Sequence, residues 1–406
     1  MILRRGRKTT GLGAGDHLRG ALCAILMLFP AAEGGSAPHQ GGLPDASPLP
    51  PGKTDPPIQV VAKGRDDRGY DCEHVRLELV LDFGARRLRG EVRHAIAATR
   101  LLETLDLDFT DSLHVLRVRL GGREALFRHE GRKLLIEMDP PLPPGAREEV
   151  RISYAGRPPR DGLLGFSFQS RDGVPAAYTL SEPSSASSWW PCKDVPDDKV
   201  TAEIVLTVPD TLYAGSNGLL VSDEADDAVE GRRIMTWRED YPIAPYLISV
   251  ACTNYEPFTD TYRSADGRTL PLLYLPYPEH REAAERSWGR IPLMLAAFEE
   301  RFGPYPFHGE KYGMAEFSWG GAMENQTLTS YGEYLVDGTD ANDWVVAHEL
   351  AHQWWGNMVT LASWEHMWLN EGFARYSEAL WYESQSGGEA YREWIRSMWR
   401  PPEWFP

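Results

Sequence analysis

The feature that most constrains this 406-residue chain is the pair His348 and His352, with Glu349 between them. Residues four apart lie on one face of an α-helix, so both imidazoles can face the same metal ion. The flanking sequence predicts such a helix, because acidic residues within 340–343 precede an apolar run and Gly356 follows as a C-terminal cap. Glu349 lies one position further round the helix and can reach a water on the metal without binding the ion itself.

A third ligand is needed, because catalytic zinc usually has three protein ligands and one position open to water. Glu371 follows His352 after eighteen intervening residues. That length allows a loop and a second helix, expected from Asn370 to about Ser386 and ended by the glycines at 387–388. The sequence therefore predicts one Zn²⁺ held by His348, His352 and Glu371.

A segment of small residues lies upstream of the two histidines. It consists of Gly320, Gly321 and Ala322, followed by Met323, Glu324 and Asn325. Small side chains let another backbone approach closely, as when a peptide adds a strand to a sheet. Glu324 would then offer a carboxylate that holds the ammonium group of the peptide and directs cleavage to its first peptide bond. The alternative is a glycine-containing turn with a solvated glutamate, and the zinc pattern favours the first interpretation.

The charge of the chain bears on its partners. The net charge is -17, which argues against nucleic acid or an anionic membrane surface as a partner, and we interpret the acidic surface as serving solubility. Three cysteines lie outside the N-terminal segment, at 72, 192 and 252, so a fully paired framework is excluded. A bridge between Cys72 and Cys252 stays open, but spacing alone does not establish it.

The first 56 residues predict a signal for export followed by a flexible linker. Residues 1–37 have a basic start and an apolar core at 20–32 that is short for a membrane span, which is typical of a cleaved signal peptide. We therefore expect a periplasmic or secreted protein with no integral span after cleavage. Residues 38–56 are rich in proline and glycine and predict a flexible linker.

Two domains are expected after the linker. Residues 57–255 show short runs in which apolar and polar residues alternate, which predicts a mostly antiparallel β domain. The runs are 75–82, 88–98, 113–120, 134–138, 148–154, 202–208 and 246–252. Residues 256–406 change in character, with a helix expected at 279–301 and a break or kink at Pro292.

Together, these motifs resemble the aminopeptidase N-like zinc metallopeptidases, the gluzincin relatives of leukotriene hydrolase. The resemblance covers about residues 65–400. Its motifs are the pentapeptide Gly321–Asn325, the zinc pattern His348–His352, the segment Asn370–Ala374, and two segments of the β region, Tyr178–Pro183 and Trp190–Pro196.

The resemblance implies an N-terminal, saddle-like all-β domain followed by a thermolysin-like α+β catalytic domain. It implies that His348, His352 and Glu371 bind zinc and that Glu349 is the general base. It also implies that Glu324 and Glu182 bind the free N-terminus of a peptide. Glu378, seven residues after Glu371, is expected to be either a carboxylate that supports a zinc ligand or part of a salt bridge.

One expected residue is absent. Members of this family have a tyrosine that stabilises the oxyanion, some sixty or more residues after the third zinc ligand, whereas this chain ends 35 residues after Glu371. Tyr376, Tyr382 and Tyr391 do not match that motif. We therefore expect a C-terminally truncated product with impaired catalysis. Two alternatives to an aminopeptidase remain: an endopeptidase or epoxide-opening hydrolase with the same zinc site, and a non-catalytic module that binds peptide N-termini.

Overall fold

The computed structural model describes residues 66–159 and 164–398. The predicted signal peptide at 1–37 and linker at 38–56 lie outside these residues. Among the helices that are described, none combines the length and the apolar character needed to cross a membrane.

The N-terminal part of the described chain is built of strands, as the alternating runs predict. In β1, residues from Val75 to Leu81 alternate between buried and partly exposed positions, because successive side chains of a strand point to opposite faces. β1 pairs in parallel with β11, while the other pairings of the largest sheet are antiparallel. The eight strands lie in the spatial order β13 (Leu219–Ala225), β14 (Arg232–Ile243), β11 (Val200–Pro209), β1 (Tyr70–Asp82), β2 (Arg87–Ala98), β8 (Arg147–Gly156), β4 (Leu113–Leu120) and β5 (Arg123–Glu124).

Two smaller sheets complete this β domain. One has the order β3 (Leu102–Asp108), β7 (Lys133–Leu142) and β6 (Phe127–Glu130). The other has the order β12 (Tyr213–Ser216), β15 (Val250–Thr253), β10 (Val174–Leu180) and β9 (Gly165–Arg171). Their inward faces share one apolar core with the large sheet, which includes Leu107, Ile136, Ala177 and Val250.

One expectation for this domain was wrong, and one possibility that the sequence left open is excluded. The strand predicted at 246–252 begins only at Val250, because Pro245 starts a short 3₁₀ helix, η2 (Pro245–Leu247), that proline favours by fixing φ and lacking an amide hydrogen. The possible bridge between Cys72 and Cys252 does not form, since both are free and buried, as is Cys192. The other short 3₁₀ helix described in this part of the chain is η1 (Ala186–Ser188).

The second part of the chain combines a sheet with helices. Its sheet has the order β16 (Phe258–Arg263), β17 (Thr269–Leu275), β18 (Tyr312–Phe317), β20 (Thr329–Gly332) and β19 (Ala322–Met323). The helices are η3 (Pro278–His280), α2 (Arg281–Trp288), α3 (Ile291–Phe302), η4 (Glu333–Leu335), α4 (Asp343–Ala351), η5 (Trp364–His366) and α5 (Trp368–Met398). The helix expected at 279–301 is divided, and Pro292 lies in the first turn of α3, where a missing amide hydrogen costs nothing.

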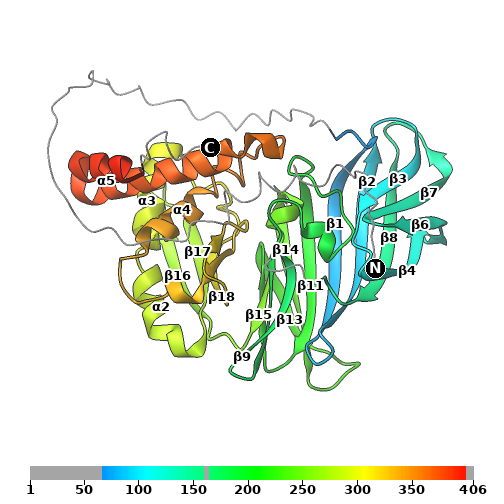
Figure 1. The fold of residues 1–406 in the computed structure, drawn as a ribbon, viewed down its shortest axis with the longest axis horizontal. Helices are drawn as coiled ribbons and strands as arrows, with labels where there is room; N and C mark the ends of the chain where they lie inside the picture. Colours follow the sequence, from blue (N-terminus) through cyan, green and yellow to red (C-terminus); the bar gives the residue numbers. More distant parts are fainter. Residues whose placement is uncertain (1–65, 160–163, 399–406) are drawn as a thin grey trace, which may run out of the picture. The chain divides into compact units, whose positions relative to one another are not determined.

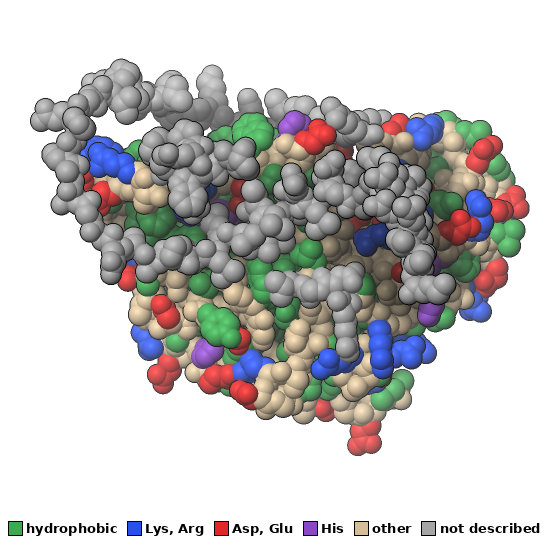
Figure 2. All heavy atoms as spheres, in the orientation of Figure 1, with side chains coloured by type: hydrophobic (Ala, Val, Ile, Leu, Met, Phe, Trp, Pro, Cys, Tyr) green, Lys and Arg blue, Asp and Glu red, His purple; other side chains and the backbone are tan. Residues whose placement is uncertain are grey.

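Helices α3, α4 and α5 contact one another and lie beside strands β16–β18 in Figure 1. Their shared core contains Phe298 of α3, Val346 and Leu350 of α4, and Trp381 of α5. This packing holds the two helices that carry the predicted metal ligands. On the face drawn in Figure 2, acidic and basic side chains of the described residues are interspersed among apolar ones.

Candidate metal centre and neighbouring carboxylates

Helix α4, which positions the predicted zinc-binding histidines, is buried in the fold. Every residue from Val345 to Ala351 is buried. Its first residue, Asp343, forms an ion pair with Arg290, and a carboxylate at a helix N-terminus also interacts favourably with the helix dipole. His348 lies in the last turn and His352 directly follows the helix in a helical conformation, so the four-residue spacing places both rings on one side.

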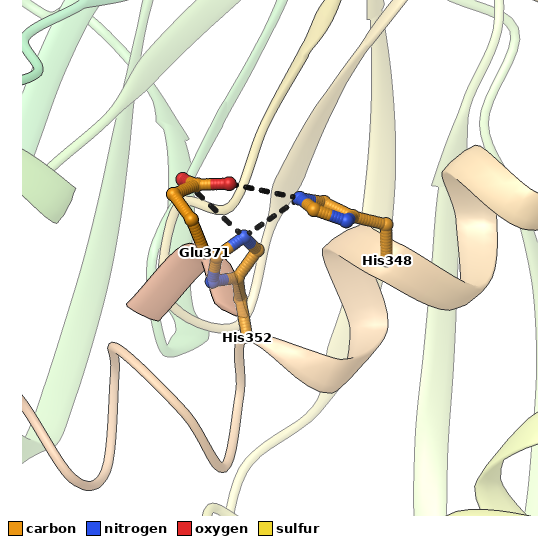
Figure 3. Close-up of side chains that lie close together, drawn as sticks. All are labelled: His348, His352 and Glu371. Carbon is orange, nitrogen blue, oxygen red and sulfur yellow. Dashed lines mark hydrogen bonds and ion pairs between the residues drawn. The ribbon is translucent and has the colours of Figure 1, made fainter. Parts of the chain in front are cut away.

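Three donor atoms converge at this point, as Figure 3 shows. His348 Nε2 lies 3.1 Å from His352 Nε2 and 3.3 Å from Glu371 Oε2. His352 Nε2 lies 3.8 Å from Glu371 Oε1. Tetrahedral zinc with bonds of about 2.0–2.1 Å to nitrogen and oxygen keeps its ligand atoms roughly 3.3 Å apart. The two imidazoles and the carboxylate therefore fit a zinc ion in both chemistry and spacing.

The other ring nitrogens are held by hydrogen bonds that orient both rings. His348 Nδ1 lies 2.8 Å from Glu378 Oε1. His352 Nδ1 donates to the Trp355 carbonyl oxygen at 3.0 Å. Both Nε2 atoms are thus directed towards Glu371, which is how proteins commonly prepare histidine for a metal.

Electrostatics set the protonation of the three donors. Burial lowers the pKa of His352 to about 4, so its ring is neutral near pH 7. Burial opposes the charge of Glu371, but the His348 hydrogen bond and the nearby imidazoles lower its pKa to about 2. Burial likewise opposes a charged His348, yet its hydrogen bonds to Glu371 and Glu378 raise its pKa well above the usual range. A metal ion that binds Nε2 of His348 therefore displaces a proton.

Glu349 lies beside these donors without a protein partner for one oxygen. Its Oε2 is buried and accepts no hydrogen bond from the described residues. Glu349, Glu324 and His352 each bring an atom within 4.8 Å of the others. Burial raises the pKa of Glu349 well above its usual range, with Glu324 and Glu371 adding to the effect and His348 opposing it. A carboxylate so placed can accept a proton from water, as a general base does.

Two further glutamates form a second cluster with Glu371. Glu182 follows β10, Glu324 follows β19, and both bring an oxygen within 4.8 Å of Glu371. Each has a buried Oε1 that accepts no hydrogen bond from the described residues. Burial and the neighbouring Glu371 raise the pKa of Glu324 to about 8. Burial and the neighbouring carboxylates also raise the pKa of Glu182 well above its usual range. Because unpaired buried carboxylates are costly, a cation at this place would be stabilised.

Comparisons with known proteins identify the family. The model of the "Peptidase M1 N-terminal domain" matches residues 71–247, and the model of the "Peptidase family M1 domain" matches residues 290–401. Together they cover more than two thirds of the chain. The chain belongs to peptidase family M1.

Curated M1 relatives are similar over most of this chain. It is 28% identical to the probable aminopeptidase 1 of Saccharolobus solfataricus, over 74% of the chain and 38% of that protein. It is 28% identical to the glutamyl aminopeptidase of Sus scrofa, over 87% of the chain and 40% of that protein. The leukotriene A-4 hydrolase of Xenopus laevis is 27% identical, over 80% of the chain and 53% of that protein. The chain thus spans about half the length of these relatives or less.

Solved M1 structures confirm the fold. The M1 zinc metallopeptidase of Deinococcus radiodurans superposes with a TM-score of 0.72 at 29% identity, over 82% of this chain and 75% of that one. A variant of that protein bound to a Tyr-Ser-Ala substrate superposes with a TM-score of 0.70. The predicted succession of an all-β domain and an α+β catalytic domain is therefore confirmed, and so is the predicted family.

The small-residue segment forms the edge of the M1 catalytic sheet. Ala322 and Met323 make up β19, which pairs on one side with β20. A Cβ on Gly321 would lie 2.4 Å from the Trp319 ring, so only glycine fits, whereas Gly320 has open space around it. The side chains of Met323 and Asn325 are buried, with Asn325 Nδ2 donating to Ser330 Oγ at 3.0 Å.

The structure places further residues at the site that we did not predict. Gln353 and Asn357 donate hydrogen bonds to the Glu324 carbonyl oxygen at 3.4 and 2.7 Å. Tyr246 is buried, and its hydroxyl accepts a hydrogen bond from Asn370 Nδ2 at 3.2 Å. Burial raises the pKa of Tyr246, and Glu324 contributes next. The available signals in the sequence are the position of Gln353 directly after His352 and the place of Asn370 in the segment Asn370–Ala374.

Proposed function

We propose that this M1 chain is a zinc aminopeptidase that hydrolyses the first peptide bond of peptides with a free N-terminus. The observation that carries the proposal is the cluster of Glu182, Glu324 and Glu371 beside the donor set of His348, His352 and Glu371. Glu371 belongs to both groups. A cation-binding site therefore adjoins a metal site, which is the arrangement that an exopeptidase acting on N-termini needs.

Zinc is the metal that the donor set favours, with His348, His352 and Glu371 as its ligands. When bound, zinc supplies Lewis-acid chemistry, polarising a carbonyl and lowering the pKa of water to about 7. The M1 proteins of known structure that are similar to this chain are described as zinc metallopeptidases, which supports the choice.

Glu349 is the general base in this proposal. Its unpaired Oε2 accepts the proton of the attacking water, and the same carboxyl group then delivers it to the leaving amine. Glu182 and Glu324, which we call the amine anchor, bind the ammonium group of the peptide and exclude substrates whose amine is blocked. Strand β19 offers its outer edge to the peptide backbone, as in strand addition.

Similar proteins support this choice of substrate. A variant of the Deinococcus radiodurans M1 zinc metallopeptidase was solved with a Tyr-Ser-Ala substrate. A variant of a two-domain M1 zinc metallopeptidase was solved with L-tryptophan. The curated relatives include a glutamyl aminopeptidase.

The test compares a free tripeptide with its N-acetylated form. We expect the zinc-loaded chain to release the first residue from the free peptide and to leave the acetylated one intact. Glu349→Gln should lower the rate by about 10²- to 10⁴-fold while zinc content is unchanged. Glu300→Gln, at an exposed position of α3, is the matched control. Equal cleavage of both peptides would favour an endopeptidase, and binding without turnover would favour a module that only binds N-termini.

We also propose that the protein is exported, which rests on the basic start and apolar core within residues 1–37. N-terminal sequencing of the protein from its native cells is the test. A mature N-terminus near Ala37 is expected, and an intact N-terminus in the cytoplasmic fraction would contradict the proposal.

A further inference from the structure

The turn that follows Glu324 has an unusual backbone at Thr327. Its φ is 61°, in the left-handed region that a β-branched residue rarely adopts. Such a conformation costs about 1–3 kcal/mol and persists only where the surroundings enforce it. Thr327 is fully buried, so protein groups surround it. Lys311 Nζ donates to its carbonyl oxygen at 3.3 Å, and the other contacts of the turn come from the β domain and from the metal centre.

The first set of contacts comes from the β domain. Glu239 of β14 is fully buried, and its Oε2 accepts a hydrogen bond from Thr327 Oγ1 at 3.2 Å. Its Oε1 accepts a hydrogen bond from Gln326 Nε2, also at 3.2 Å. The Gly218 amide donates to Thr327 Oγ1 at 2.7 Å, and Asn217 Nδ2 donates to the Gln326 carbonyl oxygen at 2.5 Å.

The second set comes from the metal centre. Gln353 accepts a hydrogen bond from the Thr327 amide at 3.0 Å through Oε1. Its Nε2 donates to the Glu324 carbonyl oxygen at 3.4 Å, and Asn357 Nδ2 donates to the same oxygen at 2.7 Å. Because Gln353 directly follows the metal donor His352, the turn is tied to the residues that hold the metal.

The buried carboxyl group of Glu239 needs a reason. Burial and the adjacent Glu310 raise the pKa of Glu239 well above its usual range, while Lys311 and the hydrogen bond from Gln326 oppose the shift, so the site is costly for a charged carboxylate. An apolar side chain would avoid this cost. Both Glu239 oxygens are instead used by hydrogen bonds from Gln326 and Thr327.

We propose that Glu239 and Thr327 are positioning residues that set the place of the Glu324 carboxylate relative to the metal donors. The inference rests on the proposed function, in which Glu324 belongs to the amine anchor. The spacing between the anchor and the metal decides which peptide bond lies at the metal, and a misplacement of about 1 Å in such a site can cost roughly 10²-fold. The β domain thereby takes part in selecting free N-termini through Glu239 as well as through Glu182.

Thr327→Val is the decisive variant, because valine keeps the shape and β-branching of threonine but removes the hydroxyl. It removes the hydroxyl that accepts from the Gly218 amide and donates to Glu239 Oε2. Thr327→Ser restores the hydroxyl and is the conservative variant. Thr253→Val is the matched control, since Thr253 is equally buried and donates to the Pro175 carbonyl oxygen at 2.9 Å, away from this turn.

The readout is the preference for a free amine. Every variant is made in the Glu349→Gln background so that peptide is not consumed, and each is loaded with zinc. Dissociation constants are measured by calorimetry for Tyr-Ser-Ala and for its N-acetylated form. We expect Thr327→Val to reduce the ratio of the two constants about tenfold or more, because the buried hydrogen bonds that hold the turn beside Glu324 are lost. Thr327→Ser and Thr253→Val should keep the parent ratio and full zinc content.

An unchanged ratio in folded, zinc-loaded Thr327→Val protein would overturn the inference. If Thr327→Val does not fold, Glu239→Gln, which keeps the size of the side chain, decides by the same criterion. A purely structural role predicts a lower Tm with an unchanged ratio, as expected for Thr253→Val. If the parent itself shows no preference for the free amine, the proposed function fails instead, so the two failures are distinguishable.

Discussion

Three donors converge on the buried carboxylate of Glu378. His348 Nδ1 lies 2.8 Å from Oε1, while Arg375 Nη1 and the Trp394 indole nitrogen donate to Oε2 at 2.7 and 3.0 Å. Such a partner fixes both the ring orientation and the tautomer of a metal-ligating histidine. Two roles were expected for Glu378, support of a zinc ligand or a salt bridge. The structure shows both kinds of contact, because one oxygen of Glu378 faces His348 and the other pairs with Arg375.

We predict that Glu378→Ala weakens zinc binding about 10- to 100-fold, because His348 loses the acceptor that orients it. Trp394→Phe, which removes the indole N–H together with part of the ring but keeps an aromatic side chain, should have a smaller effect of the same sign. Glu383→Ala is the control, since Glu383 on the same helix pairs with Arg301 at 2.9 Å. Competition with a chelator of known affinity measures the constants, and equal affinities for Glu378→Ala and the parent would contradict the role of Glu378.

The buried His94 makes the stability of the β domain depend on pH. Its ring is buried, Nε2 donates to the Pro191 carbonyl oxygen at 3.0 Å, and burial lowers its pKa to about 4. Between pH 6.5 and 4 the unfolded chain binds a proton at this position that the folded chain does not. The stability due to His94 is therefore complete above pH 6.5 and is lost as the pH falls towards 4.

Because the pKa of His94 is lowered, its titration should reduce the free energy of unfolding by about 2 kcal/mol when the pH falls from 7 to 5. His94→Gln, which does not titrate, should show a loss smaller by that amount. Urea unfolding of both proteins at the two pH values is the measurement. Parallel losses in the two proteins would show that His94 is protonated in the folded state.

Helix α5 carries Glu371 near its start and Trp394 near its end, and Gly387 changes its direction between them. Gly387 has φ 77° and ψ −174°, a conformation that is essentially restricted to glycine. The first helical segment of α5 ends at Gly387, as the glycines at 387–388 predict, and a second helical segment follows it. Because the direction of the chain changes at Gly387, the indole of Trp394 can donate its hydrogen bond to Glu378.

We expect Gly387→Ala to reduce stability by about 1–3 kcal/mol through backbone strain alone, because a Cβ there would meet no atom within 4 Å. Gly388→Ala is the control, because its Cβ would make only an ordinary contact with Arg392 and alanine favours helix. Urea midpoints should separate the two variants. Equal midpoints would indicate that Gly387 does not need its positive φ.

At the scale of the whole molecule, the strands and metal donors that could be predicted are those marked by a pattern of residues close together in the sequence. Alternation predicted β1, and the spacing of His348, His352 and Glu371 predicted three donors that the structure brings together. The hydrogen bonds of Thr327 to Gln353 and to Glu239 span 26 and 88 residues. They arise from the packing of two domains, which leaves no periodic pattern in the sequence. The domain boundary near 256 and the roles of the site residues stay predictions.

The central claim is that His348, His352 and Glu371 bind one zinc ion, on which the proposed hydrolysis of the first peptide bond depends. Elemental analysis of the folded protein, together with Glu371→Gln and Glu349→Gln, tests it most directly. We predict one zinc per chain in the parent and in Glu349→Gln, and a large loss in Glu371→Gln with folding retained. A folded parent without zinc, or a Glu371→Gln protein that keeps its full zinc content, would contradict the account.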